Sequence, residues 1–202
     1  MKEKRRVGIY GGTFNPPHNG HVFIAKRFAE ELMLDELMII PDYLPPHKEF
    51  SGTVSVEERL EMCRLAFGHI PTARISDMEI KRGGRSYTYI TLEELADEDV
   101  DLFLLIGTDM MLSFDSWRRF EYIFELATVC YARRENDEET GLLLERKVDM
   151  FRKTYGAKII NISNSPAPVS SSEIRSGNDE YRRRHLPTAV YEYIKARGLY
   201  EN

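Results

Sequence analysis

The sequence has little of what marks secreted, membrane or nucleic-acid-binding proteins. Its two cysteines, Cys63 and Cys130, belong to no CxxC pair, so we expect two buried, reduced thiols. No run approaches the roughly 18 consecutive apolar residues of a membrane helix. The basic segment 1–6 is followed by no signal-peptide core. These absences predict a cytoplasmic protein without a membrane partner.

The charge is also unlike that of a nucleic-acid binder. The formal net charge is -5 and the isoelectric point about 5.6, which argues against a nucleic-acid partner but leaves room for a local basic pocket. Apolar residues make up 42% of the chain and charged residues 30%, as in ordinary globular proteins. A length of 202 residues suits a single domain, residues 1–202, with a substantial core.

Short apolar runs alternate with helical patterns along the chain. We expect strands at 5–10, 35–41, 73–80, 99–107, 125–133 and 157–163, and helices at 19–34, 55–68, 86–98, 142–156, 171–177 and 187–198. Segment 134–141 reads as a polar, acidic loop. Ser55 and Glu58 form a capping-box pattern, and Pro187 and Gly198 fit the N1 position and the stop of the last helix. The alternation predicts an α/β fold, a doubly wound parallel sheet with a C-terminal helical tail, whose ligands bind beyond the carboxyl ends of the strands.

The segment VGIYGGTFNPPHNGH, residues 7–21, combines a strand end with unusual polar chemistry. Gly11 and Gly12 follow the first strand, where glycine permits unusual backbone angles and close approach of a ligand. The helix that begins near Asn19 directs N–H groups and its positive dipole end toward the loop. The pattern is neither GxGxxG nor GxxxxGK[ST]. It therefore predicts an anion site of another kind.

His18 and His21 are three residues apart and can share one side of the first helical turn. A metal site would need a third ligand, and HNGH lacks the glutamate of HExxH. The alternatives are phosphate contact by both imidazoles, or one buried and one surface histidine. Their place at a glycine-rich helix start favours phosphate contact and no protein metal site.

At this point GGTFNPPHNGH resembles the (H/T)xGH signature of the nucleotidyltransferase superfamily, and in detail the bacterial nicotinate-mononucleotide adenylyltransferases. The resemblance implies a Rossmann-like fold whose first loop binds ATP, with His18 and His21 catalytic and His21 on the triphosphate. The implied ATP-binding residues of this loop are Gly11, Gly12, Thr13 and Phe14. Asn15 stands where many family members carry aspartate.

The segment VSSSEIRSG, residues 169–177, offers hydroxyls, N–H groups and a guanidinium to an anion. An ordinary serine N-cap is the alternative. The segment resembles the family motif ISSTxIR, which implies ATP contact by Ser170, Ser171 and Ser172 and a catalytic role for Arg175 at the triphosphate.

Gly107 and Asp109 lie at the carboxyl end of the most hydrophobic strand. Asp109 could cap the next helix, whereas the resemblance implies that this G-x-D segment borders the adenosine. Trp117, the only tryptophan, is either a core residue or, as the resemblance implies, a contact for the pyridine ring of the mononucleotide.

Two further segments bear on the mononucleotide. GGRSYTYITLEEL resembles the family segment SYTxDTL, which implies that Thr88 and neighbouring N–H groups near Tyr87 hold the pyridine carboxylate, although Ile90 replaces the usual aspartate. Tyr87 and Tyr89 could instead be packing residues. Lys48 either binds the mononucleotide phosphate, as family members imply, or is a solvated surface lysine.

The C-terminal segment LPTAVYEYIKARGLY matches the family pattern and is interpreted as structural. We interpret RRRH, residues 182–185, as a solvated face, with charge near the triphosphate as the alternative.

The activity implied by the resemblance is transfer of the adenylyl group of ATP to nicotinate mononucleotide, giving deamido-NAD and pyrophosphate in NAD biosynthesis. A phosphate nucleophile requires no general base, and Mg²⁺ would be held mostly by the ATP phosphates. The alternatives are nicotinamide mononucleotide or pantetheine phosphate as acceptor, and a nucleotide-binding regulatory module without turnover. Either a monomer or a homodimer is expected.

Overall fold

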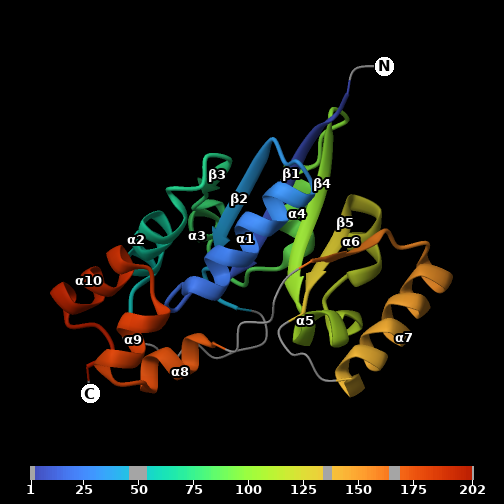
Figure 1. Ribbon diagram of the computed structural model, residues 1–202. Helices are drawn as coiled ribbons and strands as arrows, with labels where there is room; N and C mark the ends of the chain where they lie inside the picture. Colours follow the sequence, from blue (N-terminus) through green and yellow to red (C-terminus); the bar gives the residue numbers. More distant parts are fainter. Residues whose placement is uncertain (1–2, 46–53, 134–137, 164–168, 202) are drawn as a thin grey trace.

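A parallel sheet forms the centre of the computed structural model, which describes residues 3–45, 54–133, 138–163 and 169–201. In these residues six strands lie in the order β3-β2-β1-β4-β5-β6, every neighbouring pair parallel (Figure 1). The strands are β1 (Arg5–Gly12), β2 (Glu36–Pro41), β3 (Ala73–Ile75), β4 (Val100–Gly107), β5 (Ala127–Ala132) and β6 (Ile159–Ile162). The predicted doubly wound sheet is confirmed.

The strand order reverses between β1 and β4, which places the switch point at the carboxyl ends of these two strands. Gly12 and Gly107 both lie two residues beyond the paired Tyr10 and Leu105. The two glycines that end β1 and β4 therefore stand at the same level of one sheet edge.

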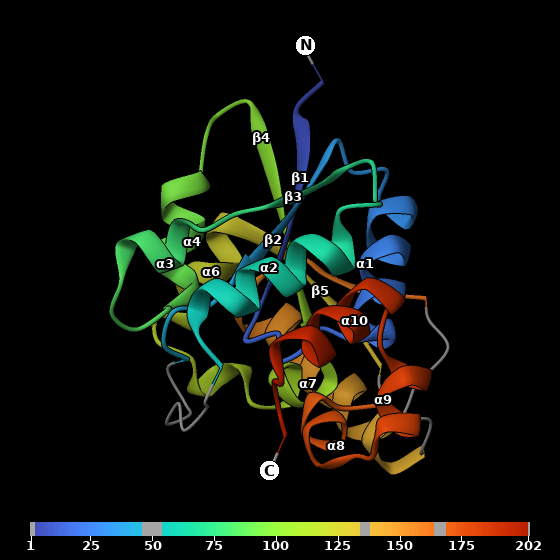
Figure 2. The ribbon, with the colours of Figure 1, turned by 90° about the vertical axis from the view of Figure 1, so that its left-hand side faces the viewer.

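Helices cover both faces of the sheet (Figures 1 and 2). Side chains of α1, α2, α8 and α10 pack in one core cluster, and those of α4, α5, α6 and α7 pack in the other. The bounds are α1 (Asn19–Glu31), α2 (Val56–Phe67), α3 (Met78–Arg82), α4 (Thr88–Leu95), α5 (Thr108–Leu112), the 3-10 turn η1 (Phe114–Ser116), α6 (Phe120–Leu126), α7 (Glu138–Tyr155), α8 (Ser171–Ser176), α9 (Asp179–His185) and α10 (Thr188–Arg197).

The hydrophobic run of β4 follows from burial on both faces. Leu102, Leu104 and Ile106 belong to the cluster of α4–α7, whereas Phe103 and Leu105 belong to the cluster of α1 and α2. A strand buried on both sides has no polar face, so its sequence shows no alternation.

Several local predictions are confirmed. The Ser55 side chain accepts from the Glu58 N–H, and the Glu58 carboxylate accepts from the Ser55 N–H, so the predicted capping box starts α2. Gly198 ends α10 with a left-handed φ of 60°, and Cys63 and Cys130 are buried and free. The prediction for Pro187 is wrong by one position, because Pro187 is the N-cap and Thr188 is the first residue of α10.

Other element boundaries were predicted wrongly. The strand expected at 73–80 ends at Ile75, and Met78–Arg82 forms α3. The acidic loop expected at 134–141 gives way to α7 from Glu138. The short helices α5, α6 and α9 were not expected. Each miss involves five to eight residues, too few for periodicity to separate helix from strand or loop.

Candidate active site

The loop after β1 connects the strand end to α1 at the switch point. Gly11 and Gly12 do not carry the unusual backbone angles that we expected, and the positive φ, 46°, falls on Phe14. A Cβ on Gly12 would lie 3.3 Å from the Phe14 ring, whereas a Cβ on Gly11 would meet only the Ile40 carbonyl, at 3.9 Å. Gly12 therefore makes room for Phe14, and exposed Gly11 leaves main chain accessible.

The Phe14 side chain points into the core. It is 3% exposed and packs edge-on against Tyr10, Phe67 and His21. Only the main chain of Phe14 is therefore placed to meet a ligand.

The two histidines start α1 by a reciprocal pair of hydrogen bonds. The His21 N–H donates to His18 Nδ1 (3.3 Å), and the His18 N–H donates to His21 Nδ1 (3.2 Å). Since both Nδ1 atoms accept, this network assigns the proton of each neutral imidazole to Nε2. The rings stack with centroids 3.6 Å apart. His18 is buried and His21 is partly exposed, so the two imidazoles lie together at the start of α1.

Gly20 allows this stacked pair. A Cβ on Gly20 would lie 3.1 Å from the His18 ring and 3.2 Å from Val169 Cγ1. Any larger residue would push the His18 ring or the segment before α8. Packing therefore explains why the third residue of HNGH is a glycine.

The segment of α8 meets the loop after β1, although the two are some 160 residues apart in sequence. Arg175 Nη1 donates to the Asn15 carbonyl (2.8 Å), and Ser171 Oγ donates to the Pro16 carbonyl (2.9 Å). The Asn15–Pro16 peptide bond between these two acceptors is cis. The two segments that the sequence predicted to bind phosphate therefore lie side by side.

The serines of this segment make internal hydrogen bonds. Ser170 is the N-cap of α8 in a capping box with Glu173, as the alternative interpretation stated, and its hydroxyl and N–H lower the pKa of Glu173. Ser172 Oγ accepts from Arg175 Nη2 (3.1 Å). The serines thus hold the short helix and the Arg175 guanidinium in place.

A buried ion pair behind the loop escaped the sequence analysis. Arg59 is fully buried and its Nη1 lies 3.1 Å from Asp42 Oδ1. The same Nη1 donates to the Thr13 carbonyl (2.7 Å), and Thr13 Oγ1 donates to Asp42 Oδ2 (2.7 Å). The only sequence signal was an arginine among the apolar positions of α2, because a buried arginine needs partners.

The loop after β2 extends this network toward the predicted mononucleotide segment. The Tyr43 N–H donates to Ser86 Oγ (3.0 Å), and the Ser86 N–H donates to the Leu44 carbonyl (2.9 Å). The next two residues, Tyr87 and Thr88, are the N-cap and the first residue of α4. Hydrogen bonds therefore run from the loop after β1 to the start of α4.

The two residues that follow Trp117 contact the start of α4. The Trp117 ring is half-buried and packs against Phe114, with centroids 5.0 Å apart, so it is not a fully buried core residue. The adjoining Arg118 guanidinium lies 5.0 Å from the centre of the Tyr87 ring, and that of Arg119 lies 5.1 Å from the centre of Tyr89. Cation–π contacts thus bring the Trp117 and Tyr87 segments together.

The remaining predicted residues are placed as follows. Gly107 is the N-cap of α5, and Asp109 is an exposed residue of its first turn, so Asp109 is not the cap that the alternative proposed. Lys48 lies outside the described residues. Arg182 is not the solvated residue that we expected, because its guanidinium donates to three main-chain carbonyls.

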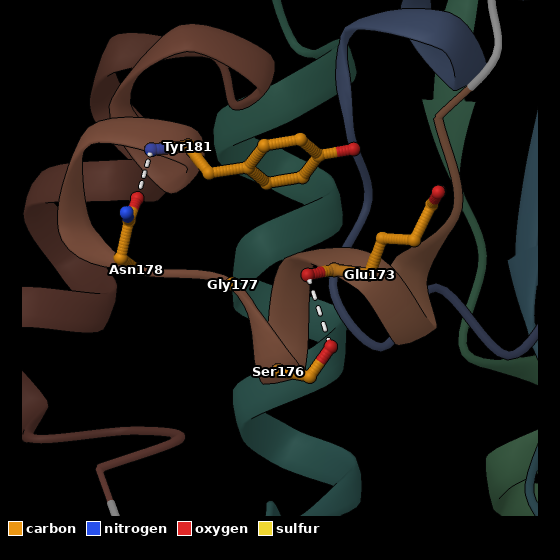
Figure 3. A pocket seen from close by; sticks show the side chains of 5 residues that line it. All are labelled: Glu173, Ser176, Gly177, Asn178 and Tyr181. Atoms are coloured by element: carbon orange, nitrogen blue, oxygen red, sulfur yellow. Dashed lines mark hydrogen bonds between the residues drawn. The ribbon is translucent and has the colours of Figure 1, made fainter.

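A shallow hollow of about 320 Å³ lies between α8 and α9, lined by Glu173, Ser176, Gly177, Asn178 and Tyr181 (Figure 3). Its lining includes none of the predicted site residues. In the part of the chain that the structure describes, no cluster of three or more histidine, cysteine or acidic residues could hold a metal ion, and no helix is long and apolar enough to cross a membrane.

Comparison with known proteins gives the same family at several levels. Residues 9–177 match the family described as "Cytidylyltransferase-like". A protein of Citrifermentans bemidjiense named "Probable nicotinate-nucleotide adenylyltransferase" is 40% identical over 96% of this chain and 98% of its own length. One of the same name from Clostridium acetobutylicum is 37% identical over 99% of this chain and 100% of its own.

Solved structures share the fold. Plasmodium falciparum nicotinic acid mononucleotide adenylyltransferase complexed with NaAD superposes with a TM-score of 0.74 at 17% identity, over 97% of both chains. Its complex with APC gives a TM-score of 0.72 at 19% identity and the same coverage. The full-length identity to curated relatives, together with the shared fold, shows that this chain belongs to the nicotinate-nucleotide adenylyltransferases within the cytidylyltransferase-like family.

Proposed function

We propose that this protein transfers the adenylyl group of ATP to nicotinate mononucleotide, forming deamido-NAD and pyrophosphate as a step of NAD biosynthesis. The names of its relatives support this activity. The observation that carries it is the contact of Arg175 Nη1 with the Asn15 carbonyl. That contact joins the histidine loop and the α8 segment at the switch point, where such folds bind nucleotides.

The reaction needs placement of two anions more than proton transfer. A phosphate oxygen of the mononucleotide attacks the α-phosphorus of ATP, and the bond from that phosphorus to the bridging oxygen breaks. Pyrophosphate leaves with the electron pair of that bond. The site therefore has to hold the reactants in line and stabilise charge on the leaving group.

We assign the triphosphate to the loop after β1. The Nε2–H groups of His18 and His21 are the donors to its oxygens, with main-chain groups of segment 11–14 beside them. Arg175 adds positive charge from α8, and the serine segment 170–172 fixes its position. Gly107 and Asp109, across the switch point, border the adenosine.

The mononucleotide is assigned to the segments joined by the cation–π contacts. Trp117 offers a partly exposed ring to the pyridine, and Tyr87 and Thr88 offer the N-terminal end of α4 to its carboxylate. Ile90 lies two residues further on α4 and provides no carboxylate there. Lys48 is the proposed contact of the mononucleotide phosphate.

Mg²⁺ fits this site as an ion carried by ATP. The donors around the loop are imidazole, guanidinium and N–H groups, which suit phosphate oxygens and not a bare cation. Mg²⁺ prefers water and substrate oxygens, and when bound to the triphosphate it would neutralise charge on the leaving pyrophosphate.

Pyrophosphate release tests the function. The protein is incubated with ATP, Mg²⁺ and one acceptor: nicotinate mononucleotide, nicotinamide mononucleotide or pantetheine phosphate. We expect release with nicotinate mononucleotide at a kcat/KM above those of the other two acceptors. A higher kcat/KM with another acceptor would replace the assigned substrate, and no release with any of them would favour a nucleotide-binding module.

A further inference from the structure

The hydroxyl of Tyr200 joins the C-terminal segment, residues 198–201, to the loop after β1. Tyr200 Oη donates to Asn15 Oδ1 at 2.5 Å, across 185 positions of sequence. Tyr200 is half-buried, and this burial raises the pKa of its phenol. The hydroxyl therefore keeps its proton at neutral pH and remains a donor.

Arg182 on α9 fixes Tyr200 relative to α8. Its Nη2 donates to the carbonyls of Tyr200 and Arg175, both at 2.8 Å, and its Nε donates to the Ile174 carbonyl at 3.1 Å. The last turn of α8 and the C-terminal segment therefore share one guanidinium. In Figures 1 and 2, α8, α9 and α10 gather beside the C-terminus.

Asn15 is the point where these contacts meet. Its carbonyl accepts from Arg175 and its side-chain oxygen accepts from Tyr200. Three residues later the loop reaches His18, which caps α1. A shift of Asn15 would therefore displace the loop segment that leads into His18 and His21.

We infer that Tyr200 and Arg182 are positioning residues of the nucleotide site. Together they form a C-terminal clamp that holds the loop after β1 and Arg175 in the arrangement that receives the triphosphate. This inference rests on the proposed function, since it assumes that ATP binds at this loop. A C-terminal segment that only packs against the core, as Leu186, Val190 and Ile194 do, would affect stability without preference for either substrate.

Tyr200→Phe is the direct test, because it removes one hydroxyl and keeps the ring. Tyr191→Phe is the matched control, since the Tyr191 hydroxyl donates to Asp179 on α9 and not to the loop. We expect Tyr200→Phe to raise the KM for ATP by about threefold to tenfold, the range of one lost hydrogen bond. The KM for the mononucleotide should stay within about twofold, and Tyr191→Phe should leave both constants unchanged.

Two further measurements complete the test. If Tyr200 acts through Asn15, adding Tyr200→Phe to Asn15→Ala should change the KM for ATP by less than about twofold. Calorimetric titration with ATP alone should show weaker binding to Tyr200→Phe than to the wild type. This titration separates the clamp from the proposed function, because it measures the effect of Tyr200 on ATP affinity even if no acceptor supports turnover.

Equal ATP affinity and equal KM for ATP in Tyr200→Phe and the wild type would overturn the inference. So would equal increases in the KM values for ATP and the mononucleotide. Absence of pyrophosphate release by the wild type would overturn the proposed function, while a loss of ATP affinity in Tyr200→Phe would still support the clamp.

Discussion

At the scale of single residues, the most specific feature is the use of one histidine for two purposes. His21 Nδ1 accepts from the His18 N–H, which fixes the helix start, and we assign its Nε2–H to a phosphate oxygen. The two ring nitrogens therefore separate a structural role from a chemical one, and substitutions that imitate each nitrogen can test them separately.

We predict that His21→Asn keeps the hydrogen bond that starts α1 and loses activity. The asparagine oxygen can stand in for Nδ1 as acceptor, but no donor replaces Nε2–H. The expected loss in kcat is about 100-fold to 1,000-fold, as for removal of one donor to a developing anion. Steady-state kinetics and thermal unfolding measure the two effects.

His21→Gln is the complementary variant. Its amide nitrogen reaches the place of Nε2, so it should retain more activity than His21→Asn but unfold at a lower temperature. If His21→Asn turned over at a near-normal rate, the assignment of His21 to the triphosphate would be wrong.

A second residue, Glu79, gives stability a dependence on pH. Burial raises the pKa of this carboxyl above its ordinary value of 4.5, although hydrogen bonds from Thr91 and Ser86 and the charge of Arg82 oppose the rise. A raised pKa means that the folded state favours the protonated form. The stability that Glu79 contributes is therefore fully present below the unfolded pKa and is lost as pH rises through the folded pKa.

We predict that Glu79→Gln becomes more stable relative to the wild type as pH rises from about 4.5 to neutrality. Glutamine keeps an acceptor for the Thr91 hydroxyl but cannot ionise. Urea unfolding of both proteins at several pH values measures the difference, and Glu121→Gln on the surface of α6 serves as the control. A difference that stays constant or shrinks with rising pH would contradict the prediction.

At the scale of elements, the long or capped segments were predictable and the short ones were not. Apolar spacing predicts α1 and α2, and the capping box also predicts the start of α2. α3 and α9 have five and seven residues, which is too few for apolar spacing to distinguish a helix from a strand or loop. Neither the Arg59–Asp42 pair nor the Tyr200–Asn15 bond has a local sequence pattern, because each joins residues that only the fold brings together.

The turn that carries Trp117 provides an element-level prediction. Trp117→Ala should raise the KM for the mononucleotide about tenfold, within the range for loss of one stacking ring, and leave the KM for ATP unchanged. Trp117→Phe should change both constants little, because it keeps a ring face and the contact with Phe114. A Trp117→Ala protein with lower thermal stability and an unaltered mononucleotide KM would return Trp117 to a packing role.

At the scale of the whole molecule, one edge of the sheet places the loops of the site side by side, and a buried hydrogen-bond network connects them. β1, β2 and β4 end at one edge of the sheet, but their loops need further contacts to keep one arrangement. Arg59 and Asp42 join the loops after β1 and β2 to α2, and Tyr43 continues the connection to Ser86. The proposed ATP and mononucleotide segments are thereby parts of one hydrogen-bonded unit.

Asp42→Ala should therefore reduce stability and disturb both substrates together. It leaves the buried guanidinium of Arg59 without the Asp42 carboxylate, and breaking a buried pair in this way costs about 3–5 kcal/mol of unfolding free energy. Glu61→Ala is the matched control on α2, the helix that carries Arg59. The partner of Glu61, Arg64, lies 3.0 Å away but is more than half exposed, so we expect a loss of about 1 kcal/mol or less of unfolding free energy. Urea unfolding measures both, and kinetics at a temperature where Asp42→Ala stays folded should show higher KM values for ATP and for the mononucleotide. Equal stability of the two variants would mean that the ion pair does not hold the two segments together.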